Sequence, residues 1–225
     1  MNLYGFFYGD HKHRVRSDNN PHGPMLLLSV LRWHAGRLVG INLLFVVSCL
    51  PVVTIPCALT AMSKVLGLML ERRICYPLYH FRKAFADQWR RSLPSGWSLL
   101  AVLAAAMLGV WFYPRSGLPL ATILGALCLV IALLLLSASI YLFPMIAFTD
   151  LGVGALLANA IRLALLCLPM TVLVLFVDAG ILAVCYLGLP YTVPVMPVIG
   201  FVLMGLVGNM AGWAAMKRYV LVKNE

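Results

Sequence analysis

Three polar side chains lie deep inside long apolar segments, and they are the residues of this chain best placed to do chemistry in a membrane. Asp178 follows the apolar run 171–177 and precedes Gly188 by ten residues, so a helix would hold its carboxylate about 15 Å from the nearer boundary. Asn209 lies inside the last apolar segment and Asn42 inside the first. An ionisable group at such depth is costly and usually faces a bundle interior or a water-filled cavity.

Asp178 is open to two interpretations. It could couple proton or cation movement through the membrane, or it could be a protonated or hydrogen-bonded structural carboxyl, which is the interpretation we favour. Asn209 is the expected partner, because it lies about one helical turn deeper than Asp178. Asn42 is a more distant third member of this candidate intramembrane polar site.

Small residues flank Asn209 in the last apolar segment. Gly208 and Gly212 form a small-xxx-small pattern, which lets a second helix approach closely. We expect this face to serve helix packing.

The elements that carry these residues must be membrane helices. The chain is 63% hydrophobic and only 11% charged, too apolar for a soluble domain of 225 residues. Its apolar runs are continuous and approach the ~20 residues that a membrane-spanning helix needs. We therefore predict an all-α fold, a polytopic transmembrane bundle over residues 25–225 that follows a polar, basic tail at 1–24. Five to six membrane helices are expected, at about 25–50, 52–70, 96–113, 119–143, 164–187 and 195–216.

Residues 38–70 could be one kinked span or a hairpin of two helices. Lys64 is the only charged residue in this stretch. Proline disrupts helices, and the stretch contains a predicted helix break at Pro51, Thr54 and Pro56.

The distribution of basic residues favours the hairpin, because Lys and Arg in short loops stay on the cytoplasmic side. The hairpin places all of the 17 Lys and Arg except Arg115 in the cytoplasm, together with both termini. A single span would leave the five N-terminal basic residues outside as well. The first helix of the hairpin must then begin near Met25.

Residues 77–93 have the pattern of a basic amphipathic helix. Aromatic residues recur every fourth position and basic residues fill the places between, at Phe81, Arg82, Lys83, Phe85, Trp89 and Arg90. We expect this helix to lie at the membrane interface, held by anionic lipid headgroups, rather than to dock a partner. The cytoplasmic bias of membrane loops already explains the net charge of +10, so no nucleic acid is expected.

The sequence carries no motif for catalysis. It has no Gly-x-Ser-x-Gly elbow, no Walker glycine-lysine loop and no pair of cysteines spaced for a metal. His11 and His13 lie in the polar tail. We expect no enzyme activity, no metal and no cofactor.

Four consecutive segments resemble the YesL-like bacterial membrane proteins, a family defined by a domain of unknown function. They are Asn-Leu-Leu at 42–44, Leu-Pro-Val-Val-Thr-Ile at 50–55, Ala-Leu-Thr-Ala at 58–61 and the aromatic-basic segment 80–93. Members often have Gly-Pro where this chain has Pro56-Cys57. The resemblance implies a bacterial plasma-membrane protein, often encoded beside carbohydrate ABC transporters and two-component regulators, and it implies no catalytic residue.

Two functions follow from these observations. The first is an integral plasma-membrane protein accessory to carbohydrate uptake or its regulation, with ABC-type permease subunits or other membrane proteins as partners. The alternative is a small ion-coupled or passive transporter, with Asp178, Asn209 and the helix break in its path. We favour the first function on the strength of the resemblance. The chain also shows no internal repeat of the kind common in transporters. The sequence specifies neither a substrate nor an oligomeric state.

Overall fold

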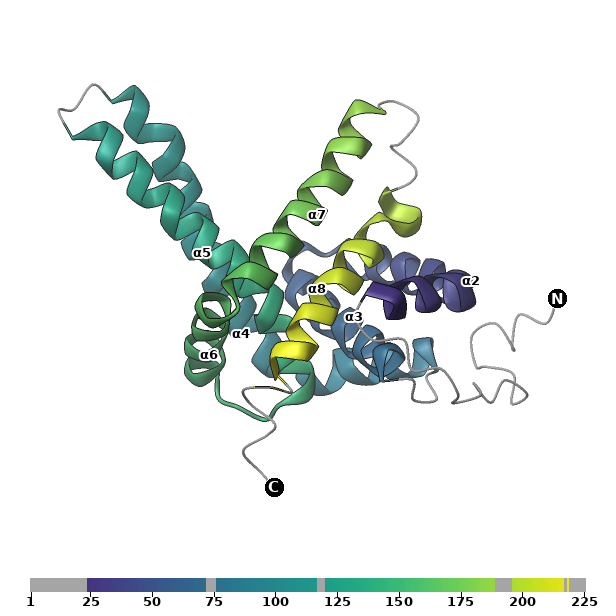
Figure 1. Cartoon of the computed structure of the whole chain (residues 1–225). Helices are drawn as coiled ribbons and strands as arrows, with labels where there is room; N and C mark the ends of the chain where they lie inside the picture. The colour runs from purple at the N-terminus through teal and green to yellow at the C-terminus, as the bar shows by residue number, and fades with distance from the viewer. Residues whose placement is uncertain (1–23, 72–75, 117–119, 189–195, 217, 219–225) are drawn as a thin grey trace.

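The computed structural model describes residues 24–71, 76–116, 120–188, 196–216 and 218, and the tail predicted at 1–24 lies outside them except for Pro24. Within these ranges the chain forms seven α-helices and no strand, so the predicted all-α class is confirmed (Figure 1). Five stretches are long and apolar enough to cross a membrane, at Val52–Leu70, Pro77–Arg115, Ala121–Phe148, Leu168–Leu187 and Val198–Met216. The described residues therefore make up a multi-pass membrane protein.

Residues 38–70 form two helices rather than one. Helix α2 (Pro24–Ser48) ends before the 3-10 turn η1 (Val52–Thr54), and α3 (Ile55–Leu70) begins directly after it. The Thr54 Oγ1 atom lies 2.6 Å from the carbonyl oxygens of both Ser48 and Pro51, which closes the turn. Pro56 occupies the first turn of α3, where its missing N–H is not needed. In α2 the stretch Ala35–Ser48 is apolar but shorter than a span.

Helix α4 (Pro77–Phe112) joins two segments that the sequence suggested were separate. The amphipathic segment 77–93 and the span 96–113 are continuous through Pro94. Gly96 lies directly against Pro56, where an added Cβ would overlap the proline ring. Helices α3 and α4 thus approach closely two residues after Pro94.

Prolines also set the boundaries in the second half of the chain. After α5 (Ala121–Phe148) the predicted span 164–187 is divided at Cys167 into α6 (Val153–Leu166) and α7 (Leu168–Leu187), with Pro169 in the first turn of α7. The predicted span 195–216 is a π-helical turn, η3 (Met196–Gly200), followed by α8 (Phe201–Met216). Helix α4 is followed directly by the 3-10 turn η2 (Tyr113–Arg115).

The core consists of two apolar clusters that share α8. One joins α2, α3, the first part of α4 and the start of α8, and its largest side chains include Leu38, Ile41, Phe45, Leu66 and Phe81. The other joins α4, the last part of α5, α6 and the end of α8, and it includes Leu99, Tyr141, Met145, Leu156 and Met216. Helix α7 contributes to neither cluster.

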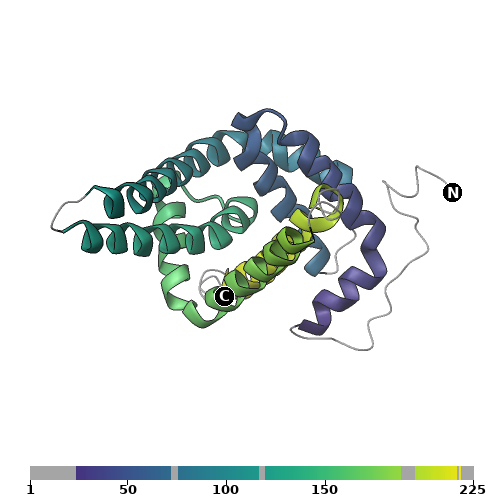
Figure 2. The ribbon, with the colours of Figure 1, turned by 90° about the horizontal axis from the view of Figure 1, so that it is seen from above.

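The helices diverge away from this core. Figure 1 shows the α4–α5 hairpin and α7 extending in different directions from the packed base of the molecule. Figure 2 shows the adjoining ends of α4 and α5 on the opposite side of the molecule from α2. Two parts of the described chain therefore have few intramolecular neighbours, namely these outer ends of α4 and α5, and helix α7.

Candidate functional site

Asn42 holds the start of the last helix. Its Nδ2 atom donates to the carbonyl oxygen of Met196 at 3.1 Å, and its Oδ1 atom accepts from the backbone N–H of Val202 at 2.8 Å. The side chain is fully buried, and the rings of Phe45 and Phe201 lie beside each other with centroids 5.6 Å apart. Asn42 thus satisfies backbone groups at the irregular turn before α8, which lipid could not do.

Asn209 joins α8 to α3 instead of to α7. Its Nδ2 atom donates to Ser63 Oγ at 3.3 Å and to the carbonyl oxygen of Gly205 at 2.7 Å. No hydrogen bond between Asn209 and Asp178 occurs among the described residues, so the expected pair does not form. Depth along a helix had suggested this pair, but the rotation of α8 turns Asn209 towards Ser63.

Asp178 lies on the helix with the fewest buried residues. In α7 only Thr171 and Val174 are buried, and the helix is attached near its first turn by the 2.7 Å hydrogen bond between Thr171 Oγ1 and Tyr141 Oη. The Asp178 side chain is half-buried, and its Oδ1 atom is buried with no hydrogen-bond partner among the described residues. The three predicted polar residues therefore occupy three separate places, and only Asp178 retains an unsatisfied buried atom.

The predicted packing glycines lie against α5. A Cβ atom at Gly212 would meet the Pro144 ring at 3.1 Å and the carbonyl oxygen of Ile140 at 3.3 Å, and one at Gly208 would meet Ile140 Cγ2 at 3.7 Å. The contact at Gly212 is tight, so glycine there lets α8 and α5 approach closely, whereas a Cβ at Gly208 would make an ordinary contact.

The amphipathic part of α4 buries one aromatic residue and exposes most of the others. Phe81 is buried and stacks on the half-buried Phe85, with ring centroids 6.5 Å apart. Trp89, expected on the same face, is 49% exposed, because the pattern continues past the elements that cover Phe81. Arg82, Lys83 and Arg90 are all exposed.

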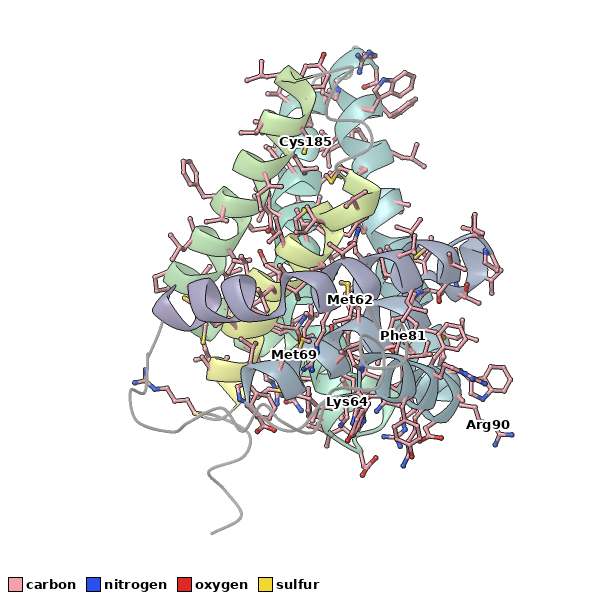
Figure 3. All side chains as sticks on the ribbon, turned by 90° about the vertical axis from the view of Figure 1, so that its right-hand side faces the viewer. Met62, Lys64, Met69, Phe81, Arg90 and Cys185 are labelled. Atoms are coloured by element: carbon pink, nitrogen blue, oxygen red, sulfur yellow. The ribbon has the colours of Figure 1, made fainter. Side chains whose placement is uncertain are left out.

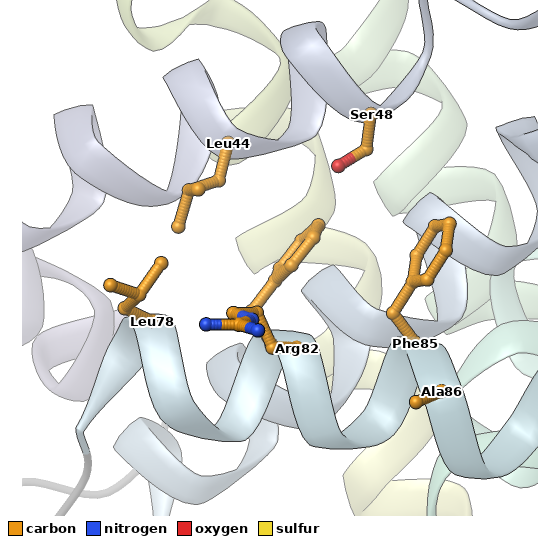
Figure 4. A pocket seen from close by; sticks show the side chains of 7 residues that line it. Leu44, Ser48, Leu78, Arg82, Phe85 and Ala86 are labelled. Atoms are coloured by element: carbon orange, nitrogen blue, oxygen red, sulfur yellow. The ribbon is translucent and has the colours of Figure 1, made fainter.

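A groove opens between this part of α4 and the end of α2. Its volume is about 330 Å³, and its wall is mainly apolar (Figure 4). The lining residues are Leu44, Ser48, Leu78, Phe81, Arg82, Phe85 and Ala86.

A polar cluster that sequence patterns did not reveal lies at the end of α5. Lys64 Nζ donates to the carbonyl oxygen of Ala147 at 2.8 Å and lies 4.1 Å from the centroid of the Phe148 ring. Gln88 Nε2 donates to the same carbonyl at 3.1 Å. Cations near a helix C-terminus are favourable, because the last carbonyl groups carry negative partial charge. The sequence feature that could have indicated this cluster is Lys64, the only charged residue in the apolar stretch 38–70.

Arg91 extends this cluster to the loop after α5. Its Nη1 atom donates to the Thr149 carbonyl oxygen at 3.2 Å, and its Nη2 atom lies 2.8 Å from Asp150 Oδ1. Among the described residues no group of three His, Cys, Asp or Glu side chains could hold a metal ion. Two buried side-chain atoms have no hydrogen-bond partner among the described residues, Gln88 Oε1 beside this cluster and Asp178 Oδ1 on α7. The groove between α2 and α4 is a separate feature that no other part of the described chain fills.

Comparison with known families gives one match. Residues 38–110 match the model of a family described as "Protein of unknown function, DUF624". The matched part includes the second half of α2, the break after it, α3 and most of α4. No curated protein and no solved structure matches the chain.

Proposed function

We propose that the protein is a non-enzymatic accessory subunit of a larger membrane assembly, and that α7 is the helix that binds the partner. The observation that carries this proposal is the half-buried Asp178 carboxyl group, which makes no hydrogen bond and no ion pair among the described residues, on a helix that buries only Thr171 and Val174. In lipid a carboxylate at the centre of a helix costs roughly 2.5 to 3.5 kcal/mol on insertion scales. A hydrogen-bond donor on a neighbouring transmembrane helix would offset that cost.

Exposed apolar side chains alone would not support this role. Helix α5 exposes residues such as Val130, which is 62% exposed, as any lipid-facing helix does. Helix α7 combines such residues, including Phe176 at 77% exposed, with a carboxyl group that lacks a partner among the described residues. The expected partner is therefore a membrane protein with a polar or basic residue at the matching depth.

The biological setting of this proposal comes from the sequence. The resemblance to YesL-like proteins supports a bacterial plasma-membrane location and a role in carbohydrate uptake or its regulation, with ABC-type permease subunits as the partners. The basic residues support a cytoplasmic position for both termini. Reporter fusions at residues 20 and 225 should then both be active in the cytoplasm, and an external N-terminal reporter would contradict that topology.

Crosslinking in native membranes tests the partner directly. A photoreactive amino acid in place of Phe176 on α7 should give a protein adduct that mass spectrometry identifies as a membrane-embedded permease subunit. The same amino acid in place of Val130 on α5 is the matched control, since both positions are exposed mid-helix. It should give lipid adducts or much less protein adduct.

Two results would contradict the proposal. Equal protein crosslinking from Phe176 and Val130 would mean that α7 has no preferred partner. Substrate uptake by the purified protein alone in liposomes, driven by an ion gradient and lost in Asp178→Asn, would favour a small transporter instead.

A further inference from the structure

The groove between α2 and α4 combines an apolar wall with one cation. Leu44 and Ser48 line it from α2, whereas Leu78, Arg82 and Phe85 line it from α4, and Leu44 and Leu78 point toward one another (Figure 4). Its volume of about 330 Å³ is within the range of small-molecule sites. The shape of the groove does not indicate a class of ligand. The positive charge of Arg82 at its edge indicates an anionic one.

Arg82 differs from the arginine further along the same helix. Arg91 binds Asp150 and the Thr149 carbonyl group, so its charge is used inside the protein. Arg82 makes no hydrogen bond and no ion pair among the described residues, and it is exposed at the groove. The groove thus presents a cation that is available for an anion.

We propose that this groove is a binding site for one anionic phospholipid. The lipid phosphate pairs with the Arg82 guanidinium group, for which phosphate is a well-matched bidentate acceptor. The first part of an acyl chain packs on Leu44, Leu78 and Phe85, while the rest of the lipid stays in the bilayer. A soluble phosphate would use the cation and leave the apolar wall exposed, so the combination favours a lipid. The site is separate from α7 and stands whether or not α7 binds a partner.

Lipid retention by the purified full-length protein tests this site. The protein is equilibrated with mixed micelles that contain phosphatidylglycerol or phosphatidylcholine, and bound lipid is counted by native mass spectrometry. We expect a preference for phosphatidylglycerol that falls about fivefold in Arg82→Gln, the effect of one basic residue at a membrane surface. Arg90→Gln is the matched control, because Arg90 lies on the same helix and points away from the bundle (Figure 3).

A second variant separates the groove from the charge. Ser48→Phe adds a ring where the Ser48 side chain points into the groove, and it leaves every basic residue in place (Figure 4). It should also lower phosphatidylglycerol binding about fivefold, because it removes the space for the lipid. Size-exclusion chromatography and circular dichroism should show that each variant stays folded.

Three outcomes would overturn the proposal. Equal losses in Arg82→Gln and Arg90→Gln would indicate general surface charge. Undiminished binding in Ser48→Phe would mean that the groove is not the site. Displacement of phosphatidylglycerol by millimolar inorganic phosphate would indicate a site for free anions instead of lipid.

Discussion

The stretch Val52–Leu70, made of η1 and α3, and helix α7 are both apolar and long enough to cross a membrane, yet they use their surfaces in opposite ways. In Val52–Leu70, 61% of the most apolar part is buried inside the protein, whereas in α7 the share is 11%. Hydropathy alone does not show whether an apolar helix is buried inside the protein or exposed. The buried share does show this, and it assigns α3 to the internal structure of the protein.

The polar groups around α3 and those on α7 also differ, in whether groups of this chain satisfy their hydrogen bonds. Between α3 and α4, Thr60 Oγ1 and Ser92 Oγ are 2.6 Å apart, and both lie within 3 Å of the Pro56 carbonyl oxygen. Asn42 and Asn209 are also satisfied by groups of this chain. Asp178 in α7 has a buried oxygen atom without a partner among the described residues. In the packed region one exception is Gln88 Oε1, which is buried without a hydrogen-bond partner among the described residues. For α7, the proposed function is that a second molecule satisfies the Asp178 carboxyl group.

The same small substitution should have opposite effects in the two regions. Gly96→Ala places a Cβ atom against the rigid Pro56 ring between α4 and α3, and should cost about 2 to 3 kcal/mol of stability as overpacking does. Gly180→Ala in α7 meets no atom within 4 Å and should stabilise by up to about 1 kcal/mol through helix propensity. Thermal unfolding in one detergent measures both. Equal effects of the two substitutions would remove the distinction between the regions.

The next largest difference in stability between the two regions is expected when a polar side chain is removed. Asn42→Leu leaves the Val202 N–H and the Met196 carbonyl group without this partner, which should cost about 2 kcal/mol in the isolated protein. Asp178→Leu removes a carboxyl oxygen without a partner among the described residues, so it should leave the stability of the isolated protein unchanged or raised. Strong destabilisation by Asp178→Leu would show that the carboxyl group is satisfied within the chain.

The smallest effects are expected at the polar end of α5. Lys64→Met removes the hydrogen bond to Ala147 and the contact with the Phe148 ring, and should cost about 1 kcal/mol. Asp150→Asn should cost less than about 0.5 kcal/mol, because its side chain is 95% exposed and its ion pair with Arg91 is screened by water. Chemical unfolding of both variants in the same detergent compares them, and a larger cost for Asp150→Asn would contradict the assigned roles.

Local sequence patterns predicted the features that depend on residues close to one another in the sequence. Apolar length predicted the membrane helices, and the residues Pro51, Thr54 and Pro56 do mark the place where α2 and α3 separate. The small residues Gly208 and Gly212 do lie where a second helix comes close. Each of these features follows from steric or length constraints that neighbouring residues impose.

Features that depend on how helices rotate against one another could not be predicted. Asp178 and Asn209 were paired by their depth along two helices, but the direction of Asn209 is set by the packing of α8 on α3. Helix α4 continues through Pro94, and Gly96 just beyond it packs on Pro56, which is distant in sequence. The partner of Lys64 lies at the end of α5 for the same reason.

The central claim is that Asp178 binds a partner outside this chain, and native gel electrophoresis of solubilised membranes tests it most directly. The wild-type protein should migrate in an assembly larger than itself, and Asp178→Asn should remain there, because the amide keeps an acceptor oxygen. Asp178→Leu should shift from the assembly to the free form by about tenfold, the equivalent of roughly 1.4 kcal/mol, without loss of folded protein. An Asp178→Leu variant that stays in the assembly as the wild type does would contradict the account.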